Sequence, residues 1–166
     1  MKNQDWGAFR FDGERVEGSI YTAVELWCEN QAAAKALYGP IASWDTSEIT
    51  DMSSLFYDKA DFNEDISRWD VSNVTGLWGT FNNATSFNGD ISRWDVSNVT
   101  SLDSTFQDAT SFNGDLSRWD VSNVTDLAYT FHGATSFSQQ LGGSWSDITA
   151  YQENSTFGGG CPGSIV

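Results

Sequence analysis

The ten-residue stretch ISRWDVSNVT at 66–75 returns letter for letter at 91–100, and comes back at 116–125 with Leu in place of the first Ile. The similarity continues beyond this stretch, because 66–90 and 91–115 match at 20 of their 25 positions. A period of this length is typical of repeat proteins in which each unit forms one coil of chain and buries its apolar side against its neighbours.

Further copies of the unit flank these two. The copy at 116–140 matches the one before it at 16 of 25 positions, a looser copy fills 41–65, and a shortened one follows the last full copy. The sequence therefore predicts three parts: an N-terminal segment with a capping helix over 1–40, four repeats over 41–140, and a degenerate repeat with a tail over 141–166.

Each repeat predicts two short elements. In S-R-W-D-V, polar and apolar residues alternate and place Trp69 and Val71 on one face, as a short strand does. In T-x-L-x-x-T-F-x-x-A, the residues Leu77, Phe81 and Ala84 follow at helical spacing, which favours a short helix or 3-10 turn. The predicted fold class is an α/β repeat, a right-handed solenoid like the leucine-rich-repeat proteins, with short parallel strands and short helical segments.

The segment TAVELWCENQAAAKALYGP at 22–40 predicts one continuous α-helix that covers the open N-terminal end of the solenoid. Thr22 and Glu25 would form a capping box, alanines fill the middle, and the Gly39-Pro40 pair ends the helix. At the other end, the glycine-rich segment FGGGCPGSIV is expected to adhere loosely.

The charge of the chain argues against several kinds of partner. Its 166 residues include 23 Asp and Glu against 8 Lys and Arg, a formal net charge of -15. Because such a surface repels phosphate groups, we expect neither nucleic acid nor an anionic lipid surface as partner. The sequence has no run of 18 apolar residues, so no membrane insertion is expected, and its first residues lack the pattern of a signal peptide.

The repeat resembles a known family. The unit F-N-x-D-I-S-x-W-D-V-S-N-V-T-x-L-x-x-T-F-x-x-A, preceded by YGPIASWDTSEITDMSSLF, is similar to the BspA-like leucine-rich repeats of mycoplasma lipoproteins and algal surface proteins, over about residues 20–157. The resemblance implies a secreted or surface-displayed protein that binds or adheres, without family-wide catalytic residues. Family members often pair a cysteine in D-L-C-x-W with a C-terminal C-P. Because QLGGSW lacks that cysteine here, Cys28 and Cys161 are expected to be free thiols.

Stacked repeats place equivalent residues in columns about 4.8 Å apart. One column should form a buried aromatic ladder, and another a buried ladder of amide hydrogen bonds. These structural ladders are Trp44, Trp69, Trp94 and Trp119, and Asn73, Asn98 and Asn123. The same asparagines begin N-x-T sequons, which burial would make incidental, so Asn83 and Asn154 are the better glycosylation candidates.

Two further columns are acidic. The first, in the expected strand, is Asp45, Asp70, Asp95 and Asp120, for which Arg68, Arg93 and Arg118 are expected to form bridges between coils. The second, at the turn, is Asp65, Asp90 and Asp115. Either backbone N–H groups satisfy the turn carboxylates, or Ca²⁺ lies among them. No other metal site and no cofactor is expected.

No residue set predicts catalysis. The one histidine, His132, is at a column that other copies fill with Tyr57, Asn82 and Gln107, so it is interpreted as a free surface position. No phosphate-binding loop and no nucleophile elbow is present. We therefore expect the chain not to be an enzyme.

The positions that vary between copies predict where a ligand binds. They lie on the outer side of the expected helix, where exposed aromatic residues among acids suit contact with a protein or a carbohydrate. Drift at unconstrained surface positions is the competing interpretation. The expected ligand-binding residues are Tyr57, Trp78, Asn82, Asp103, Gln107, Tyr129 and His132.

Together these features predict a non-catalytic binding or adhesion module, extracellular or at the cell surface, with a protein or carbohydrate surface as its partner. The alternative is a structural scaffold or accessory subunit docked in a larger assembly. A binding module should be monodisperse and bind a glycan or receptor, whereas a scaffold should self-associate or seek its complex.

Overall fold

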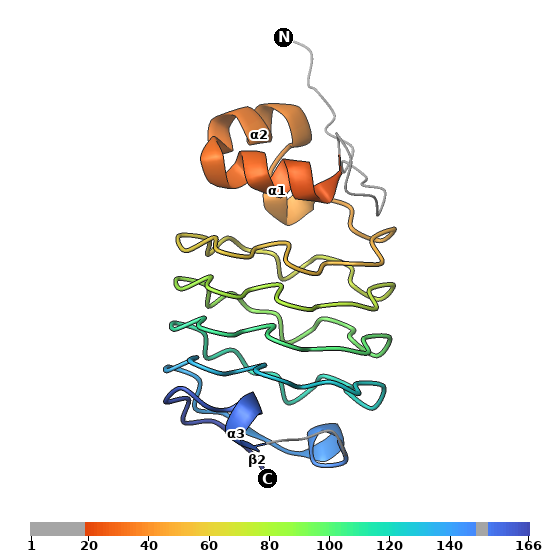
Figure 1. The fold of residues 1–166 in the computed structure, drawn as a ribbon. Helices are drawn as coiled ribbons and strands as arrows, with labels where there is room; N and C mark the ends of the chain where they lie inside the picture. The colour runs from red at the N-terminus through yellow and green to blue at the C-terminus, as the bar shows by residue number, and fades with distance from the viewer. Residues whose placement is uncertain (1–18, 149–152) are drawn as a thin grey trace.

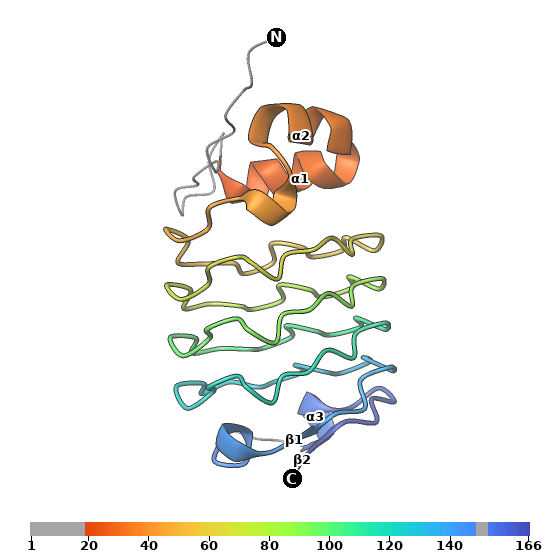
Figure 2. The ribbon, with the colours of Figure 1, turned by 180° about the vertical axis from the view of Figure 1, so that it is seen from behind.

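The structure, a computed structural model, describes residues 19–148 and 153–166. Figure 1 shows two helices at one end and coils of chain stacked one on another below them, and Figure 2 shows the same order from behind. The elements are α1 (Ile20–Glu29), α2 (Gln31–Tyr38), the 3-10 turn η1 (Ile41–Ser43), β1 (Gln140–Leu141), the 3-10 turn η2 (Gly143–Trp145), α3 (Glu153–Thr156) and β2 (Ser164–Ile165).

Each 25-residue sequence repeat forms one coil of the stack. Isolated parallel bridges join Asp51 to Gly76, Gly76 to Ser101, and Ser101 to Asp126, so residues 25 positions apart lie side by side in successive coils. We number the coils by the sequence units: coil 1 (41–65), coil 2 (66–90), coil 3 (91–115), coil 4 (116–140) and coil 5 (from 141).

Turns, not strands, form the ten-residue phrase at 66–75. The Trp69 N–H donates to the Ile66 carbonyl at 3.1 Å, and the Val74 N–H donates to the Val71 carbonyl at 2.9 Å. All four side chains are buried. The structure thus has two successive turns where a short strand was predicted, and these turns direct the same side chains to the core.

Turns form the segment between Leu77 and Ala84, for which a short helix or 3-10 turn was predicted. Gly79 and Asn83 have φ angles of 59° and 58°, in the left-handed region that a right-handed helix cannot include. The Gly79 N–H donates to the carbonyl of Asp103 in the next coil at 2.9 Å, while the Thr80 N–H donates to the Leu77 carbonyl of its own coil at 3.1 Å. The backbone thus alternates bonds between coils with bonds across single turns.

The predicted N-terminal helix is broken in two at Asn30. The Asn30 side chain accepts the Ala33 N–H at 3.1 Å, which caps α2, while Ser19 caps α1 by accepting the Thr22 N–H. The predicted capping box is therefore wrong, and Glu25 instead contacts coil 1. α2 ends at Tyr38 with Gly39 as its C-cap, where the glycine-proline pair predicted the end of the helix.

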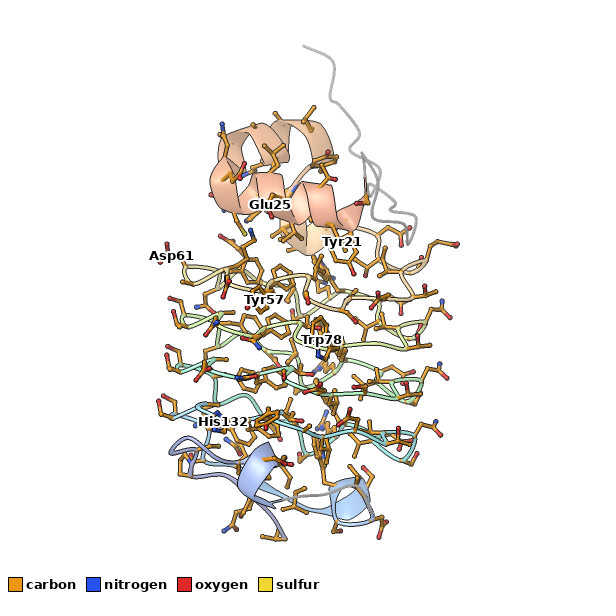
Figure 3. All side chains as sticks on the ribbon, viewed as in Figure 1. Tyr21, Glu25, Tyr57, Asp61, Trp78 and His132 are labelled. Atoms are coloured by element: carbon orange, nitrogen blue, oxygen red, sulfur yellow. The ribbon has the colours of Figure 1, made fainter. Side chains whose placement is uncertain are left out.

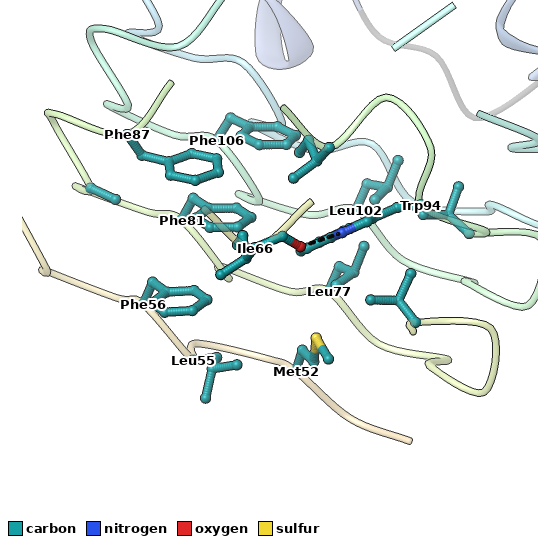
Figure 4. Close-up of a cluster of buried hydrophobic side chains, with 14 of the residues drawn as sticks. Met52, Leu55, Phe56, Ile66, Leu77, Phe81, Phe87, Trp94, Leu102 and Phe106 are labelled. Carbon is teal, nitrogen blue, oxygen red and sulfur yellow. Dashed lines mark hydrogen bonds between the residues drawn. The ribbon is translucent and has the colours of Figure 1, made fainter. Parts of the chain in front are cut away.

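The core is a set of stacked aromatic rings, part of which is shown in Figure 4. One phenylalanine column has ring centroids 5.2–5.6 Å apart: Phe56, Phe81, Phe106, Phe131 and Phe157. The last of these belongs to coil 5, where the carbonyl of Thr156 also accepts the Phe131 N–H at 2.8 Å. β2, near the C-terminus, pairs in parallel with β1, where coil 4 passes into coil 5, so the tail completes the stack and the expected loose adherence is wrong.

Candidate functional site

One face of the stack presents the positions that vary between repeats, and we call it the variable face. It consists of 51–58, 76–83, 101–108 and 126–133. Along it alternate N–H groups of coils 1 to 3 donate to the next coil, as Ser54 does to Trp78 and Ser104 does to Ala128, both at 2.8 Å. Several intervening N–H groups bond within their own coil, as Tyr57 does to Ser54 at 3.2 Å, so hydrogen bonds fix the backbone that carries these side chains.

Two columns on the variable face have left-handed backbone. The first holds Ser54, Gly79, Ser104 and Tyr129, and the second holds Asp58, Asn83, Asp108 and Gly133. A bulky residue in this conformation is uncommon, yet Tyr129 has φ 54° where coil 2 has glycine. The fold alone therefore gives no reason for a tyrosine at this position.

Three large aromatic side chains are exposed on the variable face. Tyr57 is 43% exposed, and Trp78 and Tyr129 are each 48% exposed. Figure 3 shows Tyr57, Trp78 and His132 on the same side of the molecule. The rings of Tyr129 and His132 meet edge to face with centroids 5.7 Å apart. The structure thus brings the predicted aromatic residues to one surface.

The other predicted ligand-binding residues also lie on this face. Asn82 donates to the Gln107 side chain of the next coil at 3.3 Å, and Asp103 accepts from the Ser104 hydroxyl at 2.7 Å. His132 differs from its prediction as a free surface position. It is half-buried, and a Cβ on Gly159 of coil 5 would lie 2.9 Å from its Cε1, because coil 5 packs against it.

The four tryptophans of the predicted ladder are buried, and each indole N–H donates to a backbone carbonyl earlier in the chain. Trp69, for example, donates to Ile41 at 2.9 Å and stacks on Trp44 with centroids 6.0 Å apart. The column continues with Trp145 in coil 5, which donates to Leu116 at 3.1 Å. The degenerate fifth repeat therefore keeps this part of the pattern.

The asparagine column is exposed, so the expectation of a buried ladder is wrong. Each side-chain amide of Asn73, Asn98 and Asn123 donates at 2.7–2.8 Å to the carbonyl of a serine in the preceding coil. The hydrogen bond between coils is thus donated by the side-chain amide and accepted by a backbone carbonyl. The amide of Asn83 is similarly engaged, with Asp58 at 2.8 Å, and the Asn154 side chain lies outside the described residues.

A second asparagine column, which the sequence patterns above do not indicate, directly follows a buried phenylalanine in coils 1 to 3. Its members Asn63, Asn88 and Asn113 each accept a backbone N–H from the next coil at 2.9–3.0 Å. The Phe-Asn pair repeated in these three coils is the signal that could have found it.

Hydrogen bonds from the protein itself engage the turn carboxylates. Asp65 accepts the hydroxyl and the N–H of Ser67 at 2.6 and 3.0 Å, and these bonds hold its pKa below the ordinary value. Asp90 and Asp115 have lowered pKa values from the same bonds with the serine two residues on. The described residues contain no group of three or more side chains that could hold a metal ion. The geometry therefore matches the first of the two alternatives.

The other acidic column makes the same turn with serine. Asp70 accepts the hydroxyl and N–H of Ser72 at 2.7 and 3.0 Å. The expected bridges from Arg68, Arg93 and Arg118 are wrong, since none of these three arginines forms an ion pair with the column among the described residues. Arg68 instead helps to lower the pKa of Asp65, in the turn column.

A groove that the sequence does not predict lies between α1 and coil 1, with a volume of about 490 Å³. Lys59 of coil 1 reaches Glu25 of α1 across it at 2.8 Å, and Gln31 reaches Glu64 at 2.8 Å. These partners are 33 or 34 positions apart, so no repeat pattern indicates them.

Both cysteines are free. Cys28 lines the groove, and Cys161 of coil 5 packs near Phe137 of coil 4. Desolvation raises the pKa of both thiols. Within the described ranges, no helix has both the length and the apolar character needed to cross a membrane.

The repeated coils also carry the family signal. Residues 28–145, which include all four full coils, match the family described as "Mycoplasma protein of unknown function, DUF285". The chain belongs to this family. Comparison with curated proteins and with solved structures gives no significant match.

Proposed function

We propose that the chain is a non-catalytic binding module that contacts its partner with the variable face. The observation that carries this proposal is the gathering of Tyr57, Trp78 and Tyr129 on one surface, each more than two-fifths exposed. Large aromatic side chains of this kind are enriched at interfaces, where they supply contact area with little loss of conformational entropy.

The backbone supports the same proposal. Tyr129 has a left-handed conformation that is unfavourable for its residue type and lies where other coils have serine or glycine. Strained residues of this kind cluster at functional sites. We propose further that the coils are a right-handed solenoid of the BspA-like leucine-rich-repeat type, and that the module acts at a cell surface or outside the cell, in adhesion.

The test uses two variants that change the face and leave the core intact. Trp78→Ala removes a half-exposed ring and should lower the free energy of unfolding by about 1 kcal/mol. Tyr129→Gly relieves the left-handed conformation and should stabilise the fold by about 0.5–1 kcal/mol. The double variant should therefore fold, with its melting temperature as the check.

Binding is measured on an array of immobilised glycans and immobilised proteins of acidic to basic charge. The wild-type chain should bind a subset, and W78A/Y129G should lose that binding. Leu37→Ala is the matched control, because Leu37 is 59% exposed on α2, away from the variable face. Full binding by the double variant would refute the proposal. A wild-type chain that binds nothing and self-associates would favour the scaffold alternative.

A further inference from the structure

The groove between α1 and coil 1 has a strongly acidic lining. Its carboxylates are Glu25, Glu29, Asp58, Asp61 and Glu64. Lys59 is the one basic side chain among the described residues that line it, and it is paired with Glu25. An excess of four carboxylates therefore faces the groove, which favours a positively charged occupant.

One residue that lines the groove carries a buried hydrogen-bond donor without an acceptor. Trp27 is 7% exposed, and its Nε1 has no hydrogen-bond partner in the described part of the chain. Since an indole N–H can only donate, an acceptor such as a carbonyl oxygen would satisfy it. A polypeptide supplies both features, a cationic side chain and backbone carbonyls.

The groove is continuous with the variable face. Asp58 lines the groove and also belongs to the variable face, next to the exposed ring of Tyr57. Figure 3 shows Glu25, Asp61, Tyr57 and Trp78 on the same side of the molecule. A ligand that lies on the aromatic residues of the variable face can thus reach the groove.

We infer that the partner is a basic polypeptide segment, which lies on the variable face and inserts a Lys or Arg side chain into the groove under α1. This inference rests on the proposed function and specifies the chemistry of its ligand. The net charge of -15 supports it, because an anionic glycan would be repelled from the same surface. Aromatic rings beside carboxylates also favour a cation, through contact with the ring face.

The experiment measures binding of fluorescein-labelled deca-L-lysine to the full chain by fluorescence anisotropy. The groove variant is Asp61→Asn with Glu64→Gln, which removes two charges and keeps the side-chain shapes. Its matched control is Asp95→Asn with Asp120→Asn, which removes two charges from coils 3 and 4 and keeps the oxygen that accepts the serine N–H. Melting temperatures check that all variants fold.

We expect the groove variant to raise the Kd for deca-L-lysine about 3- to 10-fold, and the control to raise it less than about twofold. Equal weakening by both variants would overturn the inference, because general charge attraction would then explain the binding. Binding of neutral maltoheptaose in preference to deca-L-lysine would also overturn it. The W78A/Y129G variant separates the two proposals. If it binds deca-L-lysine normally while D61N/E64Q does not, the proposal that the variable face binds the partner is refuted and the groove is retained as the binding site.

Discussion

A pair of residues, aspartate and the serine two positions later, sets where the chain turns. Asp65 with Ser67 and Asp70 with Ser72 make the same turn in D-I-S-R-W and in D-V-S-N-V. The sequence correctly predicted the inward Trp69, because alternation of polar and apolar residues marks burial. It could have indicated turns as well, because an aspartate side chain characteristically accepts the N–H two residues on.

These turns make stability depend on pH. Hydrogen bonds from Ser92 to Asp90 and from Ser117 to Asp115 lower the pKa of each carboxyl below the value of about 3.9 of an unfolded chain. A lowered folded-state pKa contributes stability that is present above the unfolded pKa and is lost as pH falls through the folded pKa. Replacement of both aspartates by asparagine keeps the acceptor and removes the titration.

We therefore expect D90N/D115N to be less stable than the wild type at about pH 6, with the difference shrinking as the pH falls below about 4. Urea unfolding at several pH values measures it. A difference in unfolding free energy that stays constant with pH would contradict this account.

At the scale of elements, turns with left-handed residues form the segment for which spacing alone predicted a short helix or 3-10 turn. Gly79, Asn83 and Gly133 are residue types that favour this conformation, so part of the signal was in the sequence. Ser104 and Tyr129 carry no such signal. Their conformation follows from stacking, since their coils share one backbone path with coil 2.

The break between α1 and α2 depends on one side chain. Asn30→Ala removes the acceptor for the Ala33 N–H and should lower the free energy of unfolding by about 1 kcal/mol. The chain cannot simply straighten, because Trp27 of α1 and Ala34 of α2 are both buried. Asn30→Asp, which keeps an acceptor, should cost less. Urea unfolding followed by far-UV circular dichroism compares the two, and equal losses would show that the cap is not the cause.

At the scale of the whole molecule, the coil is the unit that can be removed. Deletion of 91–115 joins coil 2 to coil 4, which present the same columns, so a shorter stack should fold. At roughly 0.05–0.15 kcal/mol per residue, its free energy of unfolding should fall by about 1–4 kcal/mol. Urea denaturation measures this. Deletion of 91–103 shifts every column and should prevent cooperative folding; a folded half-unit deletion would contradict the assignment of the coil.

The order and number of coils could be predicted, because a 25-residue period fixes which residues lie side by side. The groove could not, because it depends on how α1 lies over coil 1. The contact between Glu25 and Lys59 joins a unique helix to the most divergent full repeat, and the other three full repeats have alanine at the position of Lys59.

The hydrogen bonds that join one coil to the next also determine how the molecule responds to tension. A pull along the stack loads each boundary between coils in series, so the boundaries open one after another. Each opened coil releases 25 residues, or roughly 80–90 Å of extended chain. A protein that holds its partner on the side of such a stack would lengthen stepwise under load before it let go.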